Sequence, residues 1–242
     1  MNNTLGNFLG MLALAAAIVI GAFLASNSIK ESRADADITV TGSARKAITS
    51  DLVQWKGSIS AESSNLQAAA AELKKNVERL RQFVTQNSSD IKLELAPISS
   101  ESLTYERTNI DGSRQTIPGW RVRQRVQVES DQVQEVTALA AKTAENMLSN
   151  GIPFEADLSY LYTKLADLRI QMLEEATSDA KKRAEVIAKG AGVGIGAPRN
   201  ARVGVFQITP KNNPSVDDYG AFDTSSIEKE ITAVVSVAFV LR

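Results

Sequence analysis

The stretch Lys164–Gly192, with LADLRIQMLEEATSDAKKRAEVIAKGAG in its core, is the longest segment with a helical pattern, and the segments on either side of it have strand patterns. Small and apolar residues recur in it at spacings of three and four, which predicts one apolar face of an amphipathic helix. The residues predicted to face inward are Leu165, Leu168, Met172, Ala176, Ala180, Ala184, Ile187 and Ala191. Alanines in consecutive turns predict a helix that lies close against a sheet.

The glycines that follow this helix predict where it ends. Gly190 and Gly192 suit a helix C-terminus, because glycine readily adopts the left-handed conformation found there. Gly192, Gly194 and Ala197 also spell G-x-G-x-x-A, a variant of the dinucleotide-binding fingerprint. That fingerprint needs a strand before it and a helix after it, and the order here is reversed. We therefore predict a helix stop followed by a loop, and no cofactor.

The composition excludes several classes of chemistry. The 242 residues contain no cysteine and no histidine. A thiol nucleophile, a Ser-His-Asp triad, a disulfide and a zinc site built on imidazole or thiolate are therefore excluded. With 27 basic and 28 acidic residues, the chain as a whole has no electrostatic basis for binding nucleic acid.

The N-terminal segment has the pattern of a membrane segment or an export signal. No side chain in Met1–Ile29 is charged, and Phe8–Ala25 is a run of 18 mainly apolar residues. As a helix this run would span about 27 Å, close to the hydrocarbon thickness of a bilayer. We predict an uncleaved anchor over residues 1–29 that contacts the lipid bilayer through residues 8–25, followed by a linker over residues 30–37. A cleaved signal remains the alternative, because Ser26 and Ser28 give a small-x-small pattern.

The charges beside this segment favour the opposite orientation to export. Lys30, Arg33, Arg45 and Lys46 all lie on its C-terminal side. By the positive-inside rule they would keep the body of the protein in the cytoplasm.

The remainder of the chain, residues 38–242, predicts one α+β domain. Period-two alternation predicts antiparallel-rich sheets, and two to three long amphipathic helices are expected to pack on them. The helices are predicted from Ser64, by an S-x-x-Q capping box, to Val84, over Ser130–Asn150, and over the segment quoted first. Strands are predicted at Ile38–Gly42, Val53–Ala61, Ile91–Leu95, Trp120–Val128, Phe154–Tyr162, Val203–Ile208 and Ile231–Leu241, the last with both faces covered. Asn109–Gly112 has the residues of a hairpin turn.

The first candidate contact site is a row of arginines. Arg121, Arg123 and Arg125 fall on one face of the Trp120–Val128 strand, about 7 Å apart. Such a row suits an acidic ligand, a lipid headgroup or a neighbouring subunit. A solvated sheet face explains the row equally well, because the chain is nearly neutral.

The second candidate contact site is the polar segment Lys211–Ser226, KNNPSVDDYGAFDTSS. Loops of this length inside a compact domain are often functional. Its candidate contact residues are Asp217, Asp218, Tyr219 and Asp223. Alternatively, Asp223 caps the element that follows.

A serine–lysine pattern known from some hydrolases occurs three times. S-x-x-K begins at Ser43, Ser178 and Ser226, and no S-D-N or K-T-G motif accompanies it. The repetition shows how unspecific the pattern is. We therefore expect no catalytic, cofactor-binding or metal-ligating residue, and no enzyme, although a serine hydrolase remains an alternative.

Several stretches together resemble the SIMPL-domain family of bacterial envelope proteins, in the subgroup with an N-terminal membrane segment. Ser50 and Asp51 stand where the family often has Pro-Asp. The matching stretches are Ile38, Val40 and Gly42 in ITVTGSA, the helix at Leu66–Val84, Gly119 and Trp120 in GWRVRQRVQV, the A-x-x-x-A-x-x-x-A helix from Ala176, VGVFQITP at Val203–Pro210 and DTSSIEKEITAVVSVAF at Asp223–Phe239.

The resemblance implies an α+β body outside the cytoplasm, no catalytic residue to carry over, and assembly into large rings or channel-like oligomers. It also suggests a link to envelope or oxidative stress. Our leading hypothesis is a single-pass protein of the inner membrane with a periplasmic body, which self-assembles and has a structural or scaffolding role. The alternative from another class is an envelope binding module for an anionic ligand or lipid headgroup.

Overall fold

The computed structural model describes residues 18, 20–21, 36–108, 110, 112–213 and 220–242. Within these residues it contains antiparallel sheets and long helices, as the α+β prediction requires. The predicted apolar helix over residues 8–25 lies outside the described residues, apart from Ile18, Ile20 and Gly21. None of the described helices is both long and apolar enough to cross a bilayer.

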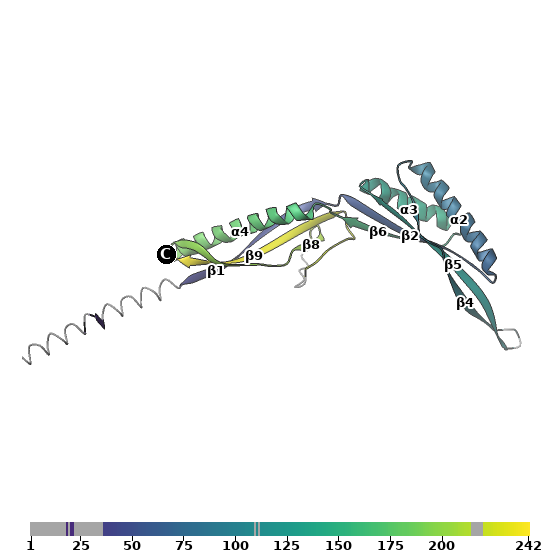
Figure 1. Ribbon diagram of the computed structural model, residues 1–242, viewed down its shortest axis with the longest axis horizontal. Helices are drawn as coiled ribbons and strands as arrows, with labels where there is room; N and C mark the ends of the chain where they lie inside the picture. The colour runs from purple at the N-terminus through teal and green to yellow at the C-terminus, as the bar shows by residue number, and fades with distance from the viewer. Residues whose placement is uncertain (1–17, 19, 22–35, 109, 111, 214–219) are drawn as a thin grey trace, which may run out of the picture. The chain divides into compact units, whose positions relative to one another are not determined.

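Twelve elements follow one another along the described chain (Figure 1). Their order is β1 (Asp37–Thr49), β2 (Leu52–Ser63), α2 (Leu66–Asn87), β3 (Glu94–Leu95), β4 (Ser99–Thr108), β5 (Arg114–Ser130), α3 (Val133–Ser149), β6 (Phe154–Leu161), α4 (Leu165–Gly190), β7 (Ile195–Val203), β8 (Gln207–Pro210) and β9 (Glu228–Leu241).

The chain divides into two compact units. The described part of the first comprises residues 18, 20–21, 36–45, 167–206 and 232–242, and the second comprises the described parts of 46–166 and 207–231. Strands β1 and β9 and helix α4 therefore contribute residues to both units.

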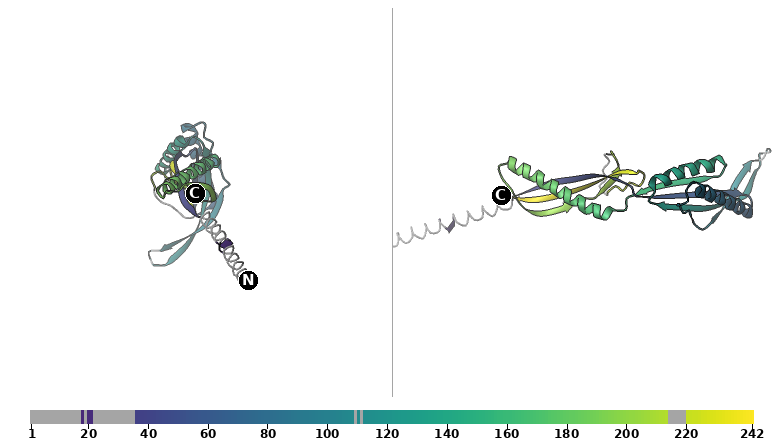
Figure 2. Two further views of the ribbon diagram at one scale, coloured as in Figure 1. Left: turned by 90° about the vertical axis from the view of Figure 1, so that its left-hand side faces the viewer. Right: turned by 90° about the horizontal axis from the view of Figure 1, so that it is seen from above.

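In the first unit, α4 covers one face of a sheet in which β9 lies between β1 and β7 (Figure 2). The buried residues of α4 are Leu168, Met172, Ala176, Ala180, Ala184 and Ala188, which are spaced by four throughout. The prediction that Ile187 and Ala191 face inward is wrong, because Ile187 is 51% exposed and Ala188 takes the inward position. A ridge of every fourth residue is inclined to the helix axis by about 26°, so it can follow the diagonal of a twisted sheet.

The closest approach in this unit joins β1 to α4. A Cβ atom added to Gly42 would overlap the carbonyl oxygen of Ala176 and the backbone nitrogen of Ala180, and would lie 2.7 Å from the Cα atom of Ala180. Next to it, the Ser43 N–H donates a hydrogen bond of 2.8 Å to Asp179 Oδ2. This hydrogen bond is the main reason why the pKa of Asp179 lies below its usual value.

Strand β9 lies in the middle of the first sheet, as predicted, but only one of its faces is buried. Ile231, Ala233, Val235, Val237 and Phe239 are at most 4% exposed, whereas the residues between them are half-buried. The prediction that both faces are covered is therefore wrong for the second face.

In the second unit, α2 and α3 cover one face of the sheet β3-β5-β2-β6, with β4 also paired to β5 (Figure 1). Trp55 of β2 is fully buried under these helices, and its ring meets that of Phe154 edge to face at a centroid distance of 6.3 Å. Leu73 of α2 and Val136 of α3 are also fully buried in this core.

Several element boundaries differ from the prediction. Helix α2 is capped by Asn65, whose Oδ1 accepts from the Ala68 N–H at 3.0 Å, so the capping box at Ser64 is wrong. Of the predicted Ile91–Leu95 strand only β3 forms. The predicted Val203–Ile208 strand is wrong in its centre, because residues 204–206 belong to no strand and only its ends lie in β7 and β8. Most of β7 lies where a loop was predicted after the long helix. At the predicted hairpin turn, residues 109 and 111 lie outside the described residues.

Replacing Gly42 by alanine is expected to destabilise the first unit. Because the new methyl group would meet helix backbone on α4, the free energy of unfolding should fall by about 1–3 kcal/mol, the cost of an overpacked core. Denaturant titration of the full-length chain in detergent, followed by circular dichroism, measures this change.

Gly190→Ala is the matched control, because a Cβ atom there meets nothing within 4 Å. It should leave the stability unchanged or raise it by up to about 1 kcal/mol. Equal stability of the two variants would contradict the close contact at Gly42.

Candidate functional site

The predicted arginine row lies on the face of the second sheet opposite the helices. Strand β5 pairs with β2 so that Arg121 lies opposite Glu62, Arg123 opposite Ser60 and Arg125 opposite Ser58. Paired residues of neighbouring strands project to the same face of a sheet. The three arginines therefore share a face, as the sequence predicts.

Arg121 is held by acidic partners within the chain. Its Nε lies 2.6 Å from Glu62 Oε1, and Glu101 Oε2 is 3.7 Å from its Nη1. The Tyr105 hydroxyl donates to the other oxygen of Glu62 at 2.6 Å. The hydrogen bonds from Tyr105 and Arg121 lower the pKa of Glu62, and the same contacts raise the pKa values of Tyr105 and Arg121.

The structure does not bring the three arginines together in one groove. Arg121 and Arg123 line a groove of about 600 Å³ that is also lined by Glu62, Glu72 and Glu155. Carboxylates outnumber guanidinium groups there, which disfavours an anionic ligand.

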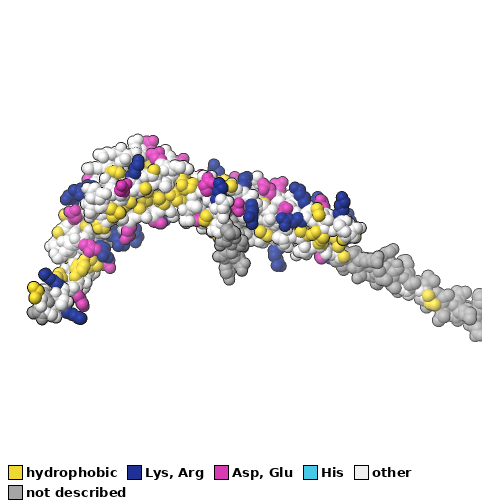
Figure 3. All heavy atoms as spheres, turned by 180° about the vertical axis from the view of Figure 1, so that it is seen from behind, with side chains coloured by type: hydrophobic (Ala, Val, Ile, Leu, Met, Phe, Trp, Pro, Cys, Tyr) yellow, Lys and Arg dark blue, Asp and Glu magenta, His cyan; other side chains and the backbone are white. Residues whose placement is uncertain are grey.

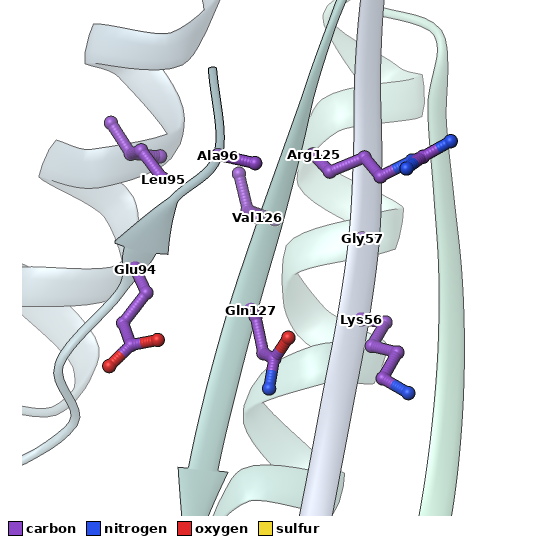
Figure 4. Close-up of a pocket in the computed structure, with 8 residues that line it drawn as sticks. All are labelled: Lys56, Gly57, Glu94, Leu95, Ala96, Arg125, Val126 and Gln127. Atoms are coloured by element: carbon purple, nitrogen blue, oxygen red, sulfur yellow. The ribbon is translucent and has the colours of Figure 1, made fainter.

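Arg125 lines a separate groove of about 350 Å³. Figure 4 shows its side chain and that of Lys56 extending away from Glu94. The two basic side chains therefore do not converge with the acidic one on a common point.

The polar segment Lys211–Ser226 is described only in part. Asp217, Asp218 and Tyr219 lie outside the described residues, whereas Asp223 is the centre of a dense hydrogen-bond cluster. Asp223 Oδ1 accepts from the Ser225 hydroxyl at 2.7 Å and from the Ser225 N–H at 3.0 Å. Its Oδ2 accepts from Lys229 Nζ at 2.8 Å, and from the hydroxyl of Ser226 as well.

The Asp223–Lys229 ion pair is buried. The Lys229 side chain is 2% exposed and that of Asp223 is 10% exposed. Burial tends to raise the pKa of Asp223, but the hydrogen bonds from Lys229, Ser226 and Ser225 outweigh it and hold this pKa well below the usual range. The carboxylate therefore stays charged at neutral pH.

This cluster fixes the segment that precedes β9 to three strands or strand ends. The Ser50 N–H donates to the Ile227 carbonyl at 2.9 Å, Tyr160 N–H of β6 donates to the Thr224 carbonyl at 2.8 Å, and Asp223 N–H donates to the Ile208 carbonyl of β8 at 2.9 Å. Asp223 thus belongs to a structural cluster, which agrees with the capping alternative more than with a free ligand contact.

The role of Lys229 is not predicted from the sequence, although the S-x-x-K pattern contains this residue. The pattern does bring Ser226 and Lys229 to a common partner, since both donate to Asp223 Oδ2. Activation of a serine requires a base that accepts its proton. Lys229 instead donates to a carboxylate, so the geometry does not favour a serine nucleophile. Among residues 36–108, 110, 112–213 and 220–242, no group of three carboxylates gathers to hold a metal ion.

Strand β4 is likewise not predicted from the sequence, because its residues are mostly polar. Its residues Ser99–Thr108 pair with Arg114–Arg123, the N-terminal part of β5. Nine of its ten residues are exposed. In Figure 3 basic, acidic and apolar side chains lie close together on the arm formed by β4 and β5. The only sequence signal for this strand is the alternation of Leu103 and Tyr105 with polar residues.

The fold and these sites define an α+β protein with helix-covered antiparallel sheets. The chain belongs to the SIMPL family, described as a protein of unknown function (DUF541), whose model matches residues 38–239. No curated protein matches the chain.

Solved structures give only weak similarity. The de novo designed protein Foldit4 has 14% identity over 45% of this chain and 96% of its own, with a TM-score of 0.26. An amidase of the hydantoinase/carbamoylase family from Burkholderia phymatum has 13% identity over 50% of this chain and a TM-score of 0.28, and the match spans 30% of the amidase. An uncharacterized conserved protein from Listeria innocua has 6% identity over 79% of this chain and 91% of its own, with a TM-score of 0.21. Matches at these scores support no argument about function.

Replacing Asp223 by asparagine is expected to lower the free energy of unfolding by about 3–5 kcal/mol, because it leaves the buried Lys229 ammonium without its counter-charge. The pKa of Asp223 is lowered by folding, so its contribution is complete above about pH 4 and is lost as the pH falls below that value. The difference between the wild type and Asp223→Asn should therefore shrink below about pH 4. Urea titrations at several pH values measure it.

Glu228→Gln is the control for this experiment, because it removes the exposed Lys211–Glu228 pair of the same segment. Its effect on the free energy of unfolding should be much smaller than that of Asp223→Asn, because solvent screens an exposed pair. A similar loss in both variants would show that burial of the Asp223–Lys229 pair is not what matters.

Proposed function

We propose that the protein is a membrane-anchored, extracytoplasmic protein that assembles with copies of itself and has a structural or scaffolding role in the cell envelope. The observation that carries the assembly part is the outer edge of β4, a ten-residue strand with nine exposed residues that pairs with β5 alone among the described strands. Long exposed strand edges present unpaired N–H and C=O groups that pair readily with another chain.

The membrane part of the proposal is supported by the sequence. The uncharged apolar run of residues 8–25 has the length of a bilayer-spanning helix. The periplasmic location and a stress-related role rest on the resemblance described above. The basic residues after the run favour the other orientation.

The proposal includes no bond-breaking step. The chain has no histidine or cysteine, and the serine of the best-placed S-x-x-K pattern donates to a carboxylate that also binds the lysine. The anion-binding alternative is less well supported, because Arg121 is already paired with Glu62 and acidic side chains outnumber arginines in its groove.

Two readouts on one membrane preparation test this function. Protease added to intact spheroplasts should digest the body of the protein, and light scattering of the detergent-solubilised chain should give a protein mass that is a multiple of 26.0 kDa. A protected body would refute export. A single species of 26.0 kDa at micromolar concentration would refute assembly.

A further inference from the structure

We propose that β4 pairs in antiparallel orientation with β4 of a second copy. The two-fold axis would lie midway between the Thr104 residues of the two copies, so that these residues are directly opposite one another. This inference rests on the proposed self-assembly and names the surface that performs it. It would join the two β4–β5 arms into one continuous four-stranded sheet, β5-β4-β4-β5.

Among the described outer strands, β4 stands out because no hydrogen bond from another described segment covers its outer edge. On β1, the Ser43 N–H is taken by Asp179 of α4. On β6, the Tyr160 N–H is taken by the Thr224 carbonyl, and β7 contains Pro198 and irregular pairing with β9. Covering groups, prolines and bulges are the usual means of blocking edge-to-edge association.

The pairing of β5 shows which backbone groups of β4 are free. The Ala96 N–H donates to the Arg125 carbonyl at 2.9 Å, so the backbone groups of Arg125 point toward the β3 and β4 side. The backbone N–H and C=O groups of successive residues in a strand point to opposite sides. From Arg125 back to the N-terminal end of β5, the backbone groups of the odd-numbered residues therefore point toward β4. Pro118 is even-numbered, so its backbone faces the side of β2. The pairing with β2 ends at Trp120, and Pro118 lies beyond that end. Its missing N–H is therefore not needed by either neighbour.

It follows that the odd-numbered residues of β4 bond to β5 and the even-numbered ones do not. Leu103 lies opposite Gly119 and Tyr105 opposite Ile117, both odd-numbered residues of β5. Ser102, Thr104 and Glu106 consequently direct their N–H and C=O groups to the open edge. Antiparallel pairing with a second chain has to use these residues.

Charge selects one register among those the free groups allow. With the axis through Thr104, Glu101 lies opposite Arg107 of the other copy, and Leu103 lies opposite Tyr105, each twice by symmetry. Moving the axis to Leu103 places Glu101 opposite Tyr105, and moving it to Tyr105 places Arg107 opposite Leu103. Only the first register pairs opposite charges, and Arg107 forms no ion pair with the residues that the structure describes.

The same register pairs the apolar side chains that β4 exposes. Tyr105 is 43% exposed and Leu103 is half-buried on the face that carries Arg121. Cross-strand pairs of an aromatic with an aliphatic residue stabilise a sheet, and a two-stranded arm alone has little stability in water. A second copy would supply the missing neighbours.

Cysteine cross-linking of the full-length chain in detergent tests this register, because the wild type has no cysteine. Residues at the axis form a hydrogen-bonded pair with Cα atoms about 5.5 Å apart, within the range of a disulfide. Thr104→Cys should therefore form covalent dimers under mild oxidation. Ser102→Cys is the matched control, since its two copies would lie about 14 Å apart. It should form at least about tenfold less dimer, whereas a mixture of Ser102→Cys and Glu106→Cys chains should cross-link.

Charge exchange provides an independent arm. In the Thr104→Cys background, Arg107→Glu alone and Glu101→Arg alone each place like charges opposite one another, so the rate of cross-linking should fall by about threefold or more. Mixing these two chains places Glu opposite Arg at every such position. The mixed dimer should therefore form at the rate of the unmodified background.

The outcomes separate this inference from the proposed function. If the wild type is oligomeric but Thr104→Cys does not cross-link, or Ser102→Cys cross-links equally well, the β4 register is wrong while self-assembly stands. Cross-linking of Thr104→Cys to another envelope protein in membranes, in place of its own copy, would also overturn self-pairing. A wild type that is monomeric by light scattering would remove both.

Discussion

Backbone hydrogen bonding at the edges of the two sheets is the constraint on which the rest of this structure depends. Helices cover sheet faces, but they leave the N–H and C=O groups of outer strands to be satisfied in other ways. Asp179 accepts from the edge of β1, and the Asp223–Lys229 cluster holds the segment whose Thr224 carbonyl accepts from β6. The Asp223–Lys229 ion pair therefore holds in place the segment that bonds to the outer edge of β6. The long edge of β4 has no such cover among the described residues.

The small-residue contact between β1 and α4 serves the same arrangement. Gly42 lets the backbone of β1 approach Ala176 and Ala180 so closely that Asp179 can reach the Ser43 N–H. A larger residue at Gly42, Ala176 or Ala180 would move α4 away from β1, so that Asp179 could no longer accept from the Ser43 N–H. The alanine spacing of α4 and the glycine of β1 thus act together, although they are more than 130 residues apart.

The sequence predicted the elements with strong periodicity and missed those whose placement depends on other segments. The α+β class, the helix at Leu165–Gly190 and the shared face of Arg121, Arg123 and Arg125 follow from local patterns. The local pattern predicts that Ile187 faces inward, but this residue is 51% exposed, because the pattern contains no information about the twist of the sheet that α4 covers. Strand β4 was missed because an exposed strand needs no apolar face, and the Asp223 cluster because its partners are contributed by the fold.

Amide hydrogen exchange at single-residue resolution is the most direct measurement of whether this protein works through paired copies of β4. In the assembled, full-length protein, the amides of Ser102, Thr104 and Glu106 should be protected as strongly as those of Leu103 and Tyr105. After dissociation to single chains, only the odd-numbered residues should stay protected, since they alone bond to β5. Rapid exchange of the even-numbered amides in an assembled sample would contradict the account.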